Sequence, residues 1–186
     1  MRKGVRNEKF HSKHPQKLEI YFQRIIIKSM KKFNLVATGG TFDIIHKGHI
    51  TLLSKAFSIS SKVIIGLTSQ ELASKKGKKL QNSYKQRLSN LEKIIKNFFP
   101  EGFYEISELN NDFGPAVLQN DVQALIVSGE TAKQGQVLND LRKQKNLPLV
   151  DIVVVPMIMA KDGKRISTTR IKRKEIDIEG NLLSFD

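Results

Sequence analysis

The sequence predicts an α/β fold, with a five-stranded parallel sheet and helices on both of its faces. Short apolar runs rich in β-branched residues alternate along the chain with segments whose apolar residues recur every three or four positions. This alternation is typical of parallel strands joined by right-handed helical crossovers. Polar stretches follow the apolar runs directly, and ligands of such sheets lie beyond the carboxyl ends of the strands.

The first predicted strand, residues 33–37, leads into a glycine turn at Gly39 and Gly40. Glycine lets the backbone turn sharply and lets a ligand approach it closely. The apolar spacing after this turn predicts a helix whose first turn carries His46 and His49. Residues three apart share one face of a helix, so both rings can point at the same ligand atoms. Together with the free amides of a helix start, this pattern predicts a phosphate site.

The remaining elements follow from the same periodicities. Further strands are predicted at residues 62–67, 103–109, 124–127 and 149–158, and helices at 84–99, 136–145 and 166–172. The stretch NDFGPA predicts a turn into a short helix that ends near Asn120. Pro156 favours an edge position or a bulge for the last strand. The serine and threonines of ISTTRIK are natural N-caps, so this helix start offers hydroxyls, amides and cations together.

Composition limits the class of protein. A chain of 186 residues fits one domain with a substantial core, and the absence of cysteine excludes disulfides, thiolate metal sites and a cysteine nucleophile. No apolar run approaches the roughly 18 residues that span a bilayer, and no secretory signal is evident. We therefore expect a cytoplasmic protein without a membrane partner. Nothing in the sequence predicts an oligomeric state.

The net charge of +14 is uneven, because residues 1–33 hold ten Lys/Arg and only two Glu. We interpret residues 1–31 as a basic N-terminal extension and residues 32–186 as the domain. A basic arm can bind nucleic acid or anionic lipid. A solvated or disordered extension, or a start assigned too early given Met30, is the simpler interpretation. No aromatic-rich basic motif supports nucleic-acid binding.

The glycine-turn segment carries a family resemblance. GTFD followed by HKGH at residues 40–49 resembles the nucleotidyltransferase superfamily, which moves a nucleoside monophosphate onto a phosphate. NDFGPA, VSGET and the closing AKDGKRISTTRIKRKEID are similar to phosphopantetheine adenylyltransferases of the archaeal and eukaryotic type, and the resemblance runs from about Lys32 to about Gly180. It implies a Rossmann-like nucleotidyltransferase fold and transfer of the adenylyl group of ATP to 4′-phosphopantetheine. The products would be pyrophosphate and dephospho-coenzyme A, a step of coenzyme A biosynthesis.

The resemblance also implies roles for individual residues. His49 would stabilise the α-phosphate in the transition state, His46 would contact the nucleotide phosphates, and Lys75 or the adjacent Lys76 would reach the acceptor phosphate. The implied ATP-binding residues are Gly39, Gly40, Thr41, Phe42, His46, His49, Ser128, Gly129, Glu130, Thr131, Ile166, Ser167, Thr168, Thr169 and Arg170. The implied acceptor-binding residues are Thr41, Lys75 and Arg87.

Two departures from the family pattern affect these assignments. Thr168 stands where the family usually has a second serine, and the loop after strand four has Ser128 and Glu130 where the bacterial branch has arginines. The cation that faces the acceptor phosphate is therefore one of Lys75, Arg87 and Arg170. Mg²⁺ is expected to enter with the triphosphate, because no carboxylate cluster suggests a metal site of the protein itself; Asp43 is expected to pin the turn.

Three other functions remain as alternatives. The first is a sibling transferase on the same fold, such as an FMN adenylyltransferase or a cytidylyltransferase, which the SGET and ISTTRIK stretches disfavour. The second is an inactive nucleic-acid-binding protein that uses the basic arm. The third is a fragment of a class I tRNA synthetase, although the chain has no Lys-Met-Ser-Lys-Ser stretch.

Overall fold

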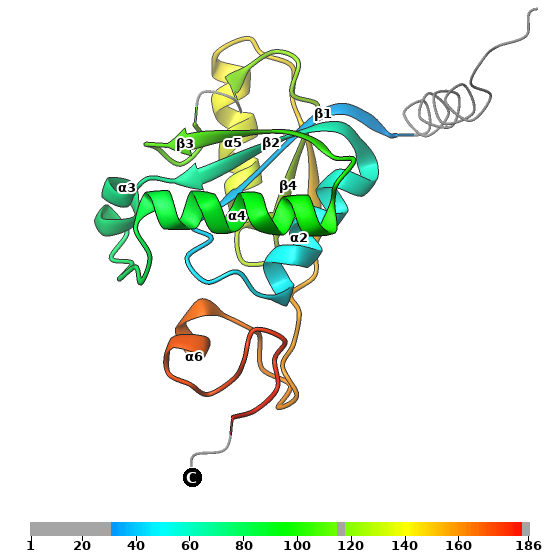
Figure 1. Cartoon of the computed structure of the whole chain (residues 1–186). Coiled ribbons are helices and arrows are strands. Elements are labelled where there is room, and N and C mark those ends of the chain that lie inside the picture. The colour runs from blue at the N-terminus through cyan, green and yellow to red at the C-terminus, as the bar shows by residue number, and fades with distance from the viewer. Residues whose placement is uncertain (1–30, 115–117, 184–186) are drawn as a thin grey trace, which may run out of the picture. The chain divides into compact units, whose positions relative to one another are not determined.

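The computed structural model describes residues 31–114 and 118–183 (Figure 1). The features predicted for residues 1–30, and part of the short helix expected before Asn120, lie outside the described residues. The centre of the domain is a five-stranded parallel sheet, as the sequence predicted, and its strands lie in the order β3-β2-β1-β4-β5. Its strands are β1 Phe33–Gly40, β2 Ser60–Thr68, β3 Phe103–Leu109, β4 Ala124–Ser128 and β5 Asp151–Val155.

The position of β1 at the middle of the sheet creates the site. The chain runs outward from β1 to β2 and β3, and then returns to place β4 on the other side of β1. Thr38 of β1 lies opposite Ile65 and Ile126 of its two neighbours, and its hydroxyl donates to the Ile126 carbonyl at 2.9 Å. The order of strands thus reverses between β1 and β4, and a crevice opens at the carboxyl ends of such a pair.

Helices cover both faces of the sheet (Figure 1). The helices are α2 Lys47–Ile59, α3 Gln70–Lys75, α4 Tyr84–Phe98, α5 Ala132–Gln144 and α6 Thr168–Lys172. Leu53 of α2 and Leu91 of α4 pack with one face of the sheet, and Leu138 of α5 packs with the other. None of the described helices is both long and apolar enough to span a bilayer.

Predicted and observed elements differ mainly at their ends. Helix α5 begins at Ala132, four residues earlier than predicted, and β5 ends at Val155, directly before Pro156, at the edge of the sheet. Helix α3 was not predicted, because its sequence was interpreted as a lysine-rich loop. The Ser69 side chain caps it by accepting a hydrogen bond from the Leu72 amide, which satisfies one of the free donors of the first turn.

The segment after β5 forms a small separate cluster in which Ala160, Ile166 and Ile176 are buried. The Lys47 amide at the start of α2 donates to the Ile178 carbonyl at 3.0 Å. This bond joins the segment to the first turn of α2, so α6 lies near the two histidines.

Candidate active site

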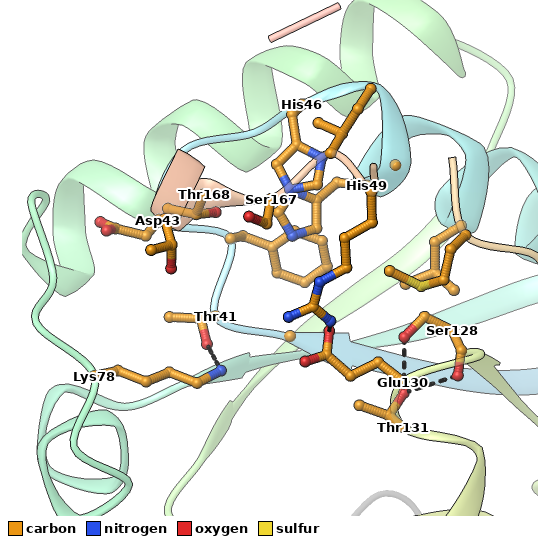
Figure 2. A pocket seen from close by; sticks show the side chains of 18 of the residues that line it. Thr41, Asp43, His46, His49, Lys78, Ser128, Glu130, Thr131, Ser167 and Thr168 are labelled. Carbon is orange, nitrogen blue, oxygen red and sulfur yellow. Dashed lines mark hydrogen bonds and ion pairs between the residues drawn. The ribbon is translucent and has the colours of Figure 1, made fainter. Parts of the chain in front are cut away.

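A pocket of about 640 Å³ lies at the carboxyl ends of β1 and β4 (Figure 2). It is lined by the glycine turn, the first turn of α2, the loop after α3, the loop after β4 and the start of α6. All of the predicted ATP-binding residues line it except Gly129 and Arg170. The structure therefore brings four distant segments of the chain to one place, as the motifs indicated.

The glycine turn is tightly packed. A Cβ atom on Gly39 would lie 3.0 Å from the Gly66 carbonyl oxygen, and one on Gly40 would lie 3.2 Å from the Phe42 ring. Phe42 has a φ of +47°, in the left-handed region that side chains other than glycine rarely adopt, and its ring is fully buried. Packing of this ring holds the strained backbone and fixes where Thr41 and the pocket wall lie.

His46 and His49 stand together at the start of α2. Their ring centroids are 4.0 Å apart, and the Phe42 ring lies 5.0 Å from that of His49. The lack of a side chain at Gly48 leaves room for the His46 ring, because a Cβ at Gly48 would lie 3.1 Å from that ring. The Nδ1 atoms of both histidines are buried and have no hydrogen-bond partner within the described residues, which is uncommon for buried polar atoms.

Burial keeps both rings neutral in this structure. It lowers the pKa of His46 to about 4 and, with the charges of His46 and Lys78, that of His49 to about 3. A hydrogen bond with the backbone of Ile44 opposes the shift of the His49 pKa. The negative charge of a bound phosphate favours the protonated form, in which both ring nitrogens carry N–H donors, so either ring can then donate to an oxygen in the pocket.

Lys78 lines the pocket beside the glycine turn. Its Nζ donates to the Thr41 hydroxyl at 2.8 Å, and Figure 2 shows the two side chains joined by this bond. Desolvation lowers the Lys78 pKa, the charge of Lys76 lowers it further, and Glu130 opposes the shift.

Lys75, the predicted lysine, does not reach this site. It lies on α3, where its Nζ pairs with Glu71 at 2.8 Å on the exposed surface. Lys76, the expected alternative, pairs with Asp112 and lines a smaller adjoining pocket. Gly77, with a φ of +69°, turns the chain between these lysines and Lys78. The four neighbouring lysines offer no sequence signal that would have distinguished them.

Two predicted arginines also lie outside the pocket lining. Arg87 is fully buried, and its Nη1 donates to the carbonyl oxygens of Thr41 at 2.8 Å and Thr68 at 2.7 Å. Arg87 thus stabilises the backbone of the glycine turn at Thr41 without lining the pocket. Arg170 is held by ion pairs to Asp162 at 2.6 Å and Glu175 at 2.9 Å, which keep it away from the predicted phosphate position.

Asp43 pins the turn, as the sequence analysis expected. Its buried carboxylate accepts from the amides of Gln81 and Asn82 at 2.9 to 3.1 Å and pairs with Lys172 at 2.5 Å. Burial raises the Asp43 pKa, but these hydrogen bonds and the charge of Lys172 outweigh it, so the pKa lies below its ordinary value. Lys172 also donates to the Lys79 carbonyl at 2.6 Å, so the carboxylate and the ammonium join the turn, the lysine loop and α6.

Besides Lys78 and Lys79, three cations of the pocket were missed as site residues: Arg165, Lys172 and Arg173. These three lie in the KRISTTRIKR stretch, where the cations follow one another so closely that their spacing does not show which side chains face the pocket. Arg165 and Glu130 both line the pocket, and Arg165 Nη1 lies 2.8 Å from Glu130.

A second pocket of about 140 Å³ adjoins the first. Asn111 and Phe113 of the NDFGPA stretch line it together with Leu109. The two pockets share the glycine turn, and they meet at Thr41 and Lys78. This arrangement provides room for two ligands whose ends come together beside one lysine.

The carboxylates of the larger pocket are already paired. Asp43 lies against Lys172, and Glu130 against Arg165. Within residues 31–114 and 118–183, no group of three or more His, Cys, Asp or Glu side chains is placed to hold a metal ion.

Comparisons with known proteins agree on the kind of fold. A family model described as cytidylyltransferase-like matches residues 37–174. The chain is 37% identical over 153 residues to the phosphopantetheine adenylyltransferase of Methanothermobacter thermautotrophicus, covering 82% of this chain and 92% of the relative. It is 44% identical over 149 residues to that of Methanosarcina barkeri, covering 79% and 91%. A crystal structure of a protein of unknown function from Archaeoglobus fulgidus superimposes with a TM-score of 0.58 at 27% identity, covering 66% of this chain and 89% of that one.

Proposed function

This chain belongs to the cytidylyltransferase-like family, and from that premise we propose that it transfers the adenylyl group of ATP to 4′-phosphopantetheine. The observation that carries the proposal is the pair of pockets that meet at Thr41 and Lys78. The larger pocket suits a nucleoside triphosphate, and the smaller one suits the phosphate end of the acceptor. The identity of that acceptor comes from the relatives, which are phosphopantetheine adenylyltransferases.

The reaction joins two anions. An oxygen of the acceptor phosphate forms a bond to the α-phosphorus of ATP, the bond from that phosphorus to the β-phosphate oxygen breaks, and pyrophosphate leaves. No side-chain nucleophile is needed, so the protein contributes by holding the phosphates in line and by stabilising the charge that develops. His49 lines the pocket, where one of its ring nitrogens would donate to an α-phosphate oxygen.

Lys78 takes the role that was expected of Lys75 or Lys76, because Lys76 lines only the smaller pocket and Lys75 lines neither. It borders both pockets and already bonds to the Thr41 hydroxyl, so its ammonium can bridge the acceptor phosphate and the α-phosphate. Arg87 acts through Thr41, whose carbonyl it holds, and is a positioning residue. The start of α6, with Ser167, Thr168 and Thr169, would hold the β- and γ-phosphates beside Lys172.

Mg²⁺ would arrive with the triphosphate. The two carboxylates of the pocket lining are paired with cations, so this donor set suits an ion held mainly by phosphate oxygens. When bound, the ion would neutralise part of the phosphate charge.

The test is an acceptor panel with the purified full chain. ATP and CTP are each combined with 4′-phosphopantetheine, FMN or a phosphorylated alcohol; pyrophosphate release is measured and products are identified by mass. We expect dephospho-coenzyme A from ATP and 4′-phosphopantetheine alone. Equal turnover with CTP, or turnover only with another acceptor, would move the assignment to a sibling transferase. A variant with His46 and His49 both replaced by alanine controls for contaminating activity.

A further inference from the structure

The ion pair between Glu130 and Arg165 joins the loop after β4 to the segment before α6, both of which line the larger pocket, and it has no role in the reaction described above. We propose that Arg165 is a further phosphate-binding residue whose partner changes: Glu130 holds its guanidinium in the free protein, and the phosphate chain of the bound nucleotide takes it over. This inference rests on the nucleotide-binding part of the proposed function. It assigns the ligand chemistry to a polyphosphate, and not to the base or the ribose.

The ion pair is weak enough to exchange. Arg165 Nη1 lies 2.8 Å from Glu130 Oε2, but the two side chains are 49% and 57% exposed. Exposed pairs of this kind contribute little, because water screens the charges and both long side chains lose freedom. A phosphate chain with several charges is a stronger partner for a guanidinium, which can bind two of its oxygens at once.

The backbone of Arg165 is held much more firmly than its side chain. It forms an antiparallel bridge with Met159, and its carbonyl accepts from Arg170 Nη1 at 3.1 Å. Arg170 is in turn fixed by Asp162 and Glu175. The change of partner from Glu130 to phosphate therefore requires only rotation of the Arg165 side chain. Arg165 lies two positions before Ser167, the N-cap residue of α6, so its side chain starts close to the proposed phosphate site.

Glu130 is otherwise unexpected in this pocket. The lining holds several cations and the glycine turn, all suited to phosphate, yet Glu130 lies among them beside Ser128 and Thr131 (Figure 2). Its charge reaches Lys78 as well, since it opposes the lowering of that pKa. A carboxylate here competes with any anion for the cations. A monophosphate competes poorly and a triphosphate well, so Glu130 would select for the longer phosphate chain.

The first test uses Arg165→Gln, with Lys164→Gln as the matched control. Lys164 is the preceding residue; it is exposed and outside the pocket lining, and its substitution removes the same charge. Calorimetry with ATP, AMP and adenosine on the full chain measures affinity. We expect Arg165→Gln to weaken ATP binding by about tenfold, AMP binding less and adenosine binding not at all. The proposal would be overturned if Arg165→Gln weakened adenosine binding as much as ATP binding. It would also be overturned if Lys164→Gln weakened ATP binding as much as Arg165→Gln does.

The second test uses Glu130→Gln, which keeps the shape of the side chain and removes its charge. We expect ATP to bind roughly 1.5- to five-fold more tightly, the range that corresponds to loss of an exposed ion pair. In the double variant with Arg165→Gln most of this gain should disappear, because no guanidinium remains to be released and only the effect of Glu130 on Lys78 is left. A gain that persists in full, or weaker binding by Glu130→Gln alone, contradicts the exchange. Melting temperatures of all variants exclude misfolding.

The outcomes also separate this inference from the proposed function. A chain that binds ATP with these dependences but does not adenylate 4′-phosphopantetheine refutes the function alone. Normal turnover together with unchanged ATP affinity of Arg165→Gln refutes the inference alone. A wild-type chain that binds no ATP refutes both.

Discussion

Replacing His49 with alanine tests the catalytic arrangement directly. The ring lines the pocket, its Nδ1 atom is buried without a hydrogen-bond partner among the described residues, and its pKa of about 3 leaves it neutral at pH 7 before a phosphate binds. Loss of one donor that acts on developing charge raises the barrier by about 2.7–4 kcal/mol, which is roughly a hundred- to a thousand-fold in kcat. ATP affinity should change much less, because the glycine turn and the start of α6 still hold the remaining phosphates.

The effect on stability should be small. The substitution removes ring contacts with Phe42 and His46, which contribute about 0.5–1.5 kcal/mol each for pairs of this kind. It also removes a buried nitrogen that has no partner, and this partly offsets the loss. We therefore expect His49→Ala to unfold in urea with at most about 2 kcal/mol less stability than the wild type.

The assay combines initial rates of pyrophosphate release at saturating substrates, ATP calorimetry and urea unfolding. His49→Asn serves as the matched variant, since it keeps an N–H donor at a similar place and should recover part of the rate. The reasoning is refuted if a folded His49→Ala protein retains near-normal kcat. It is also refuted if the variant loses stability while turnover per folded molecule is preserved, because the histidine would then be a packing residue.

Three further predictions follow from the same geometry. Lys78→Met should lower kcat/KM for 4′-phosphopantetheine about tenfold or more, whereas Lys75→Met should leave it near the wild-type value in steady-state assays. Arg87→Met leaves two backbone carbonyls without their donor and should cost about 2–4 kcal/mol in urea unfolding and reduce kcat, with partial recovery in Arg87→Lys. The pKa values of His46 and His49 are lower in the folded state than the ordinary 6.5, so stability should be full above pH 6.5 and fall as the pH drops toward 4. Urea unfolding at pH 7.5 and 5.5 should show a loss of about 1 kcal/mol per histidine, and a variant with both changed to glutamine should lose less.

The strands and the histidine pair could be predicted because their signals are local. An apolar run such as residues 33–37 is buried wherever it folds, and two histidines three apart on a helix must share a face. The position of Arg87 on its helix also indicates a buried side chain. It lies four and eight residues before Leu91 and Ile95, on the buried face of α4, so its position on the helix indicated burial although its charge suggested a ligand.

The pocket cations could not be predicted, because their selection depends on tertiary contacts. Lys75 and Lys78 are separated by one turn of backbone at Gly77, and either side chain is long enough to reach a phosphate. Only the ion pair to Glu71 in one case, and the bond to Thr41 in the other, distinguish them. These contacts join segments that no periodicity connects.

The partners of the cations divide them into two groups with different tasks. Arg87 is bound by backbone carbonyls, and Arg170 and Lys172 by carboxylates that are mostly shielded from water; these fix the turn, the segment before α6 and the lysine loop. Among the described residues, the Lys78 ammonium has a neutral hydroxyl as its hydrogen-bond partner, and the Arg165 guanidinium has an exposed carboxylate. A guanidinium or ammonium whose partner is strong stays with the protein, while one whose partner is weak can turn to a phosphate. Because the two groups carry the same charge, total charge does not identify the cations that bind substrate, whereas the strength of each existing partner does.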